Sequence, residues 1–229
     1  MNEVLIERFS TSNQTLNLEL KAGETKTLIV FNEGNTDITY NLNANLKAGA
    51  NLAVYNVVTS NHDTILNQEI TLEEKSANVE VLNVLLVGKS AKLTSNIMIN
   101  HLEEETTSNF LNYAIAKDEA SMVLNNNARI VKGAKKSVVM QKAKGLTLSA
   151  SAKIKAMPNL FIDEYDVIAN HAAAIGSISK EDLFYLMSRG LEEATASSLI
   201  VLGFIKPLLD KIEDQTLKLE INQKFIENL

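Results

Sequence analysis

A short alternating segment recurs along most of this chain, and each copy begins just after a small residue. Alanines mark five of these starts, at Ala50, Ala77, Ala91, Ala120 and Ala134, which are 27, 14, 29 and 14 residues apart. These spacings correspond to one or two units of about fourteen residues, room for a strand of roughly five to seven residues and a turn. Because one such unit cannot bury its apolar face alone, the period predicts a solenoid of stacked units.

The segments between about residues 25 and 160 have the composition of strands. Apolar side chains alternate with polar ones, as in residues 93–99, and no proline precedes Pro158. An antiparallel sandwich would also give many short strands, but the near-constant spacing favours a parallel β-helix. Two interpretations of the frequent asparagines, which include residues 125–127, stay open: stacked side chains that satisfy turn backbones, or ordinary polar loop residues.

The pattern changes to that of helices after Gly176. Residues 179–182 resemble a capping box, an apolar stripe follows, and Gly190 is placed to end the first helix. A second helix is expected from about residue 192 to 204 and an amphipathic third one over residues 208–229, with Pro207 starting a helix or kinking one. We therefore predict a mainly β chain with a β-helix body, residues 1–176, and a C-terminal helical module, residues 177–229.

The composition excludes several classes of function. The 229 residues carry a formal net charge of −6 and include no cysteine. An acidic chain is a poor partner for nucleic acid, and a chain without thiols can form neither disulfides nor thiolate ligands to a metal or cluster. The first ten residues do not resemble a secretory signal, and no apolar run is long enough to span a membrane, so we expect a cytoplasmic protein without a membrane partner.

Histidines are the remaining candidates for chemistry. His62 and His101 are expected in surface loops. On physical grounds alone, His171, with small residues on both sides, is expected to be a buried, hydrogen-bonded structural histidine rather than a ligand. The phosphate-binding, dinucleotide-binding and serine-hydrolase motifs are absent from the sequence, which predicts a protein that is not an enzyme and has no catalytic residues.

The C-terminal third carries a recognisable pattern. A proline and an extended segment lead to His171 and Gly176 within residues 158–176. Residues 182–191 then read Asp-Leu-Phe-Tyr-Leu-Met-Ser-Arg-Gly-Leu, and Gly203 and Phe204 follow on the next expected helix. In order and spacing these residues resemble the C-terminal signature of the SufB/SufD family, which assembles iron–sulfur clusters in the SUF system.

The resemblance implies a fold, partners and site residues. It implies a right-handed parallel β-helix that pairs with a SufB-like scaffold subunit, and a helical module that docks a SufC-like ABC ATPase. His171 matches an interface histidine of the SufD members, where it would be a ligand for iron or for a transient iron–sulfur cluster, with no cofactor bound stably. The implied ATPase-docking residues are Asp182, Phe184, Tyr185, Ser188, Arg189, Gly190 and Phe204.

The lack of cysteine favours the SufD members over SufB, whose scaffold role needs a thiolate, and the short chain suggests a minimal form. Pairing as a homodimer instead of a heterodimer stays open. A stand-alone β-solenoid that binds carbohydrate or protein is the alternative function, although it leaves the motif at residues 188–190 unexplained. A β-helix enzyme such as a polysaccharide lyase ranks last, because no basic residue in a carboxylate-lined cleft is evident.

Overall fold

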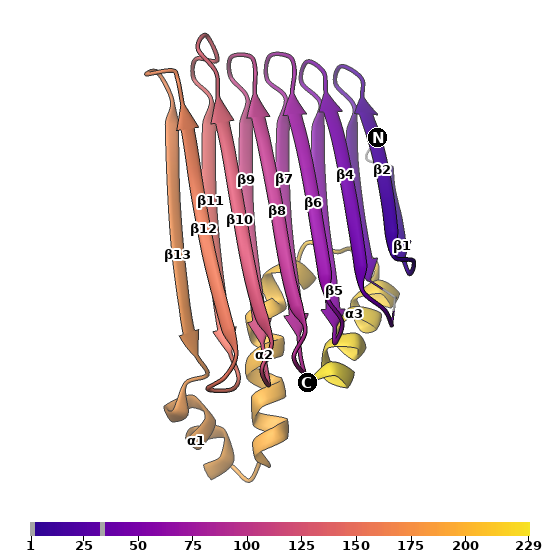
Figure 1. Ribbon diagram of the computed structural model, residues 1–229, viewed down its shortest axis with the longest axis vertical. Coiled ribbons are helices and arrows are strands. Elements are labelled where there is room, and N and C mark those ends of the chain that lie inside the picture. The colour runs from indigo at the N-terminus through magenta and orange to yellow at the C-terminus, as the bar shows by residue number, and fades with distance from the viewer. Residues whose placement is uncertain (1–2, 33–34) are drawn as a thin grey trace.

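The computed structural model describes residues 3–32 and 35–229, which form a parallel β-solenoid followed by three helices (Figure 1). The strands are β1 (Glu3–Phe9), β2 (Asn13–Leu20), β3 (Thr25–Asn32), β4 (Ile38–Leu46), β5 (Asn51–Ser60), β6 (Thr64–Leu72), β7 (Asn78–Val87), β8 (Lys92–His101), β9 (Thr107–Ala116), β10 (Ser121–Ile130), β11 (Val138–Thr147), β12 (Lys153–Ile162) and β13 (Ile168–Ser177). The helices are α1 (Lys180–Ser188), α2 (Glu193–Leu209) and α3 (Gln215–Asn228). The prediction of a mainly β, parallel solenoid with a C-terminal helical module is confirmed.

Two sheets form the walls of the solenoid. Odd-numbered strands make one sheet in the order β1-β3-β5-β7-β9-β11-β13, and even-numbered strands make the other in the order β12-β10-β8-β6-β4-β2. Every neighbouring pair of strands is parallel, so the chain alternates between the walls and completes one rung with every two strands. Strands were expected between about residues 25 and 160, and the structure adds β1, β2 and β13 outside that range.

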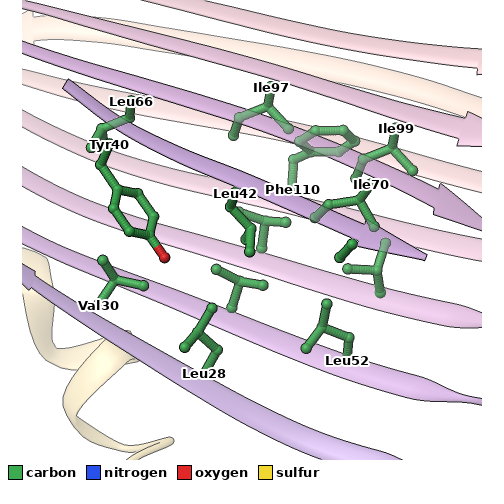
Figure 2. Close-up of a cluster of buried hydrophobic side chains, with 14 of the residues drawn as sticks. Leu28, Val30, Tyr40, Leu42, Leu52, Leu66, Ile70, Ile97, Ile99 and Phe110 are labelled. Carbon is green, nitrogen blue, oxygen red and sulfur yellow. The ribbon is translucent and has the colours of Figure 1, made fainter. Parts of the chain in front are cut away.

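Apolar side chains from both walls fill the interior (Figure 2). Leu28, Val30, Leu52 and Phe110 come from the odd-numbered sheet, and they meet side chains of β4, β6 and β8 across the interior. The alternation in the sequence follows directly, because successive residues of a strand face opposite sides of the sheet.

The marking alanines lie where the chain turns from one wall into the other. Ala50, Ala77, Ala91 and Ala120 each directly precede a strand, and all four are buried. Ala134 is also buried but precedes β11 by a longer turn. Small side chains are required at these corners because adjacent rungs stack their turns directly on one another.

Asparagines stack in ladders along the strands. On the outer face of the even-numbered sheet, Asn67 donates to Asn41 (2.9 Å), Asn96 to Asn67 (2.8 Å) and Asn125 to Asn96 (2.7 Å). Of the two interpretations left open, the one that makes residues 125–127 loop residues is wrong, because they occupy the middle of β10. Asparagines do satisfy turn backbones elsewhere: Asn78 Nδ2 donates to the carbonyl of Ser76 at 2.9 Å.

A second asparagine ladder runs from rung to rung inside the solenoid. Asn56 Nδ2 donates to Asn83 Oδ1 at 2.6 Å, and Asn83 Nδ2 donates to Asn112 Oδ1 at 2.8 Å. Gln68, on the opposite wall, donates back to Asn56 Oδ1 at 2.9 Å. All four side chains are buried, so each amide depends on its neighbours for the hydrogen bonds that water would otherwise supply.

The helix signals are largely confirmed, with shifted boundaries. Ser179 Oγ accepts the Asp182 backbone N–H at 3.0 Å and so caps the start of α1. Gly190, with a φ of +90°, ends the same helix. The second helix runs beyond its expected end and includes Pro207 in its last turn. The third begins later than expected, where Asp214 caps α3.

Helices α2 and α3 cover the outer face of the odd-numbered sheet. Their buried side chains and outward-facing residues of five strands form one hydrophobic cluster, which includes Ile29, Tyr55, Leu82, Tyr113, Leu146, Val201, Ile205, Leu217, Ile221 and Phe225. Two ion pairs add to it, Arg8–Glu220 at 2.6 Å and Lys211–Glu80 at 2.7 Å. The division into two domains at residues 176 and 177 stays a prediction, and this cluster joins the two parts.

His101 corrects a sequence expectation, because it lies inside the solenoid and not in a surface loop. Its side chain is fully buried at the end of β8. The ring nitrogens lie 2.8 Å from Thr106 Oγ1 and 2.8 Å from Ser108 Oγ, and Thr106 continues to Ser137 at 2.8 Å. Burial lowers the pKa of His101 to about 4, so the ring is neutral in the folded chain.

We expect His101 to make the folded state sensitive to acid. The unfolded chain binds the imidazole proton with an ordinary pKa of about 6.5, so stability falls as the pH falls from 6.5 towards 4. At about pH 4.5 the loss should be roughly 2 to 3 kcal/mol. Urea unfolding at neutral and acid pH measures it, and His101→Gln should reduce the pH dependence by that amount. Identical pH dependence in the two proteins would contradict the assignment.

The two asparagine ladders give a matched pair of variants. Asn83→Ala leaves Asn112 Oδ1 buried without a partner and leaves Asn56 Nδ2 with only its 3.3 Å bond to Gln68 Oε1, and should lower the free energy of unfolding by about 2 to 4 kcal/mol. Asn96→Ala removes equivalent ladder bonds on the outer face, where water replaces them, and should cost less than about 1 kcal/mol. Chemical denaturation measures both losses. Equal losses of unfolding free energy would contradict the difference we expect between the buried and the exposed ladder.

Candidate functional site

The last rung of the solenoid, formed by β12 and β13, is open on one side. Within the described chain, neither strand has a further strand beside it. Large apolar side chains are exposed on this rung and on the turn inside it: Met157, Phe161, Ile162, Tyr165, Ile168 and Ile175. We call this surface the open end. It combines unpaired backbone groups with apolar side chains, the two properties of a surface to which another sheet can pair.

His171 lies on this rung. It is in the middle of β13 and is exposed, so the expectation of a buried structural histidine is wrong. Its strand pairs in register with β11, where His171 is opposite Gln141. Because parallel neighbours in register project side chains to the same side, His171 faces the interior side of the sheet at the point where the interior opens. The two inward-facing neighbours along β13, Ala169 and Ala173, are small and leave the ring room to move.

The other histidines lie elsewhere. His62 is in the turn between β5 and β6, and His101 is buried at the end of β8. In residues 3–32 and 35–229, no group of three or more histidine, cysteine, aspartate or glutamate side chains could hold a metal ion. His171 therefore lies outside any such group.

Helix α1 is a second exposed surface. None of its residues is buried; Phe184 and Tyr185 are 73% and 58% exposed. The guanidinium of Arg189, at the helix C-cap, lies 5.3 Å from the centre of the Tyr185 ring, a cation–π distance. Asp182, in the first turn, is exposed as well. Aromatic and arginine side chains held this way are typical anchors of protein interfaces.

The remaining residues of the predicted docking set have local structural roles. Ser188 Oγ donates to the Phe184 carbonyl at 2.8 Å within its own helix, and Gly190 supplies the positive φ that ends it. Phe204 is half-buried on α2, where its ring meets Tyr113 of β9 edge-on at 5.4 Å. These three residues have structural roles in the module, whereas Phe184, Tyr185 and Arg189 present large exposed side chains that a partner could contact.

The sequence pattern missed Gln141. It is 2% exposed, faces the interior on β11, and donates from Nε2 to the carbonyl of Asn159 at 3.4 Å. The rung spacing is the signal that would have found it, because His171 follows it by one rung and occupies the register position beside it.

No helix in the described part of the chain has both the length and the apolar character needed to cross a membrane.

Known proteins resemble the chain over most of its length. The profile of a family described as SUF system FeS cluster assembly, SufBD core domain, matches residues 6–204. The iron–sulfur cluster assembly protein SufD of Bacillus subtilis is 31% identical over 165 residues, which are 69% of this chain and 38% of that protein. SufD of Plasmodium falciparum is 27% identical over 99% of this chain and 15% of its own length, and a SufBD family protein of Pyrococcus horikoshii is 41% identical over 43% of this chain and 22% of that protein. The chain thus spans well under half the length of these relatives.

Proposed function

The chain belongs to the SufBD core family, and from this premise we propose that it is a SufD-like, non-catalytic subunit of a cytoplasmic iron–sulfur cluster assembly complex. The observation that carries the proposal is the open end, because it places an exposed histidine among apolar side chains on an unpaired rung. Iron and the nascent cluster are the cargo of such a complex, not resident cofactors of this subunit. Two relatives are named as iron–sulfur cluster assembly proteins, and these names support the same role.

The open end is the surface that we assign to a SufB-like scaffold subunit. Pairing β13 or β12 with a strand of the partner would satisfy their free backbone groups and cover side chains such as Phe161 and Ile168. A second copy of this chain could use the same surface, so a homodimer competes with the heterodimer. Either arrangement encloses His171 between two subunits, where its imidazole nitrogen can bind iron together with ligands of the partner.

Helix α1 is the surface that we assign to a SufC-like ABC ATPase. It projects away from the sheets at the end of the molecule where β13 finishes (Figure 1). Only a short connection, residues 178–179, separates the ATPase-docking helix from the strand that carries His171. A movement of α1 driven by ATP binding would therefore act directly on β13 and on the subunit interface.

Purification together with a SufB-like subunit and a SufC-like ATPase tests the complex, with mass measured by light scattering. We expect one copy of this chain, one scaffold subunit and two ATPases. Phe184→Ala with Tyr185→Ala should weaken ATPase binding by about 30-fold or more, because both rings are exposed anchors. Leu219→Ala, which removes an equally exposed apolar side chain from α3, is the matched control and should bind normally. A chain that binds neither partner would refute the proposed complex.

His171→Ala tests the role of the open end in chemistry. The variant should assemble normally, because the side chain is exposed, but cluster formation should fall by about tenfold or more when one ligand is lost. Iron–sulfur absorbance during reconstitution measures the effect, and His62→Ala provides a control in a distant turn. Failure of the variant to assemble would instead make His171 a structural residue.

A further inference from the structure

The interior asparagine ladder ends at an unpaired amide, and two further unpaired amides lie on the strands that follow it. It runs from Asn56 through Asn83 to Asn112, where the Asn112 Nδ2 group has no hydrogen-bond partner among the described residues. Two acceptors on the following strands are also unpaired: Asn126 Oδ1 on β10 and Gln141 Oε1 on β11. All three side chains are at most 2% exposed. Unpaired amides this deeply buried are rare in folded proteins and require a physical explanation.

These side chains occupy the last rungs before the open end. Asn112 is on β9, Gln141 is on the next strand of the same sheet, and His171 is on the strand after that. Gln141 and His171 are register partners, and neighbouring strands lie about 4.8 Å apart. The imidazole is thus the first side chain beyond Gln141 in the direction of the open end.

The other contacts of Gln141 restrict what its oxygen can do. Its Nε2 group donates to the carbonyl of Asn159 on the opposite wall, so exchanging the two ends of the amide would lose that bond. The oxygen keeps two lone pairs, and neither accepts a hydrogen bond from another described residue. An imidazole N–H is the donor that the neighbouring strand supplies.

We propose that Gln141 is a positioning residue for His171: its side-chain oxygen accepts the N–H of one imidazole nitrogen and leaves the lone pair of the other nitrogen facing out of the open end. The bond forms by rotation of the His171 side chain, which is exposed and has small neighbours at Ala169 and Ala173. No change of the backbone is needed, and exposed side chains rotate within nanoseconds.

The hydrogen bond has a chemical consequence. A neutral imidazole binds a metal through the nitrogen without a proton, and the partner of the other nitrogen decides which tautomer is present. Gln141 would therefore select one tautomer and one ring orientation. The use of the free nitrogen for iron rests on the proposed function, whereas the hydrogen bond itself does not.

The test measures the tautomer of His171 in the full chain without any partner. Long-range proton–nitrogen correlation spectra of histidine-labelled protein, in mildly alkaline buffer, report which ring nitrogen carries the proton. We expect one dominant tautomer in the wild type. Gln141→Met should shift the tautomer ratio by about fivefold towards that of free histidine, the effect of one lost hydrogen bond. Gln141→Glu loses the same bond to Asn159 but keeps an acceptor oxygen, and should retain the wild-type tautomer.

Two controls make the result decisive. Gln68→Met removes a buried glutamine amide whose partner is Asn56, far from the open end, and should leave the His171 signals unchanged. The wild type alone gives a second measurement, because a bonded imidazole N–H is protected from exchange with solvent. The proposal is overturned by an unprotected N–H, or by Met and Glu variants that shift the tautomer ratio equally.

Failure of the proposal about Gln141 can be distinguished from failure of the proposed function. A chain with the expected tautomer that binds neither partner would keep Gln141 as the positioning residue and remove the assembly role. A chain that assembles with both partners but shows no preferred tautomer would keep the assembly role and overturn the inference about Gln141.

Discussion

Hydrogen bonding between rungs is the constraint on which the rest of this structure depends. The backbone of each strand is satisfied by the strands of the rungs before and after it, in register and in parallel. Side chains follow the same rule, because a buried asparagine such as Asn83 finds its partners in identical positions of its neighbours. A rung is therefore complete only when it lies between two others, and in the described chain that condition fails at the β1–β2 rung and at the open end.

The sequence predicted the repeating part of the fold well, for a physical reason. Alternation and corner alanines are both direct results of stacking, so they recur in most of the well-buried rungs. They fade in β1 and β2, where fewer side chains are buried, and in β13, where a run of alanines gives little alternation. Asn126 and His101 were misplaced because a polar residue inside a solenoid has the same local pattern as one in a loop. Its burial depends on hydrogen-bond partners one rung away, which no local window contains.

The sequence predicted the elements that carry the candidate residues, but not how exposed each residue is. The expected helix is present as α1, and the extended segment before it is present as β13, which contains His171. It could not separate Phe184, which is exposed, from Phe204, which packs on Tyr113, because both are apolar aromatic residues on helices. Gln141 was missed because its relation to His171 exists through the pairing of β11 with β13 and not through the sequence between them.

Helices α2 and α3 stabilise some rungs of the solenoid more than others. A stack of rungs held by nearest-neighbour contacts alone would unfold rung by rung from either end. Here one hydrophobic cluster contacts strands from β3 to β11, and Arg8 ties β1 to α3, so most rungs are bound into one cooperative unit. The final rung, β12 and β13, contributes no buried side chain to this cluster. We therefore expect it to open locally at a lower free-energy cost than the rungs behind it, and to adjust more readily to the shape of a neighbouring subunit.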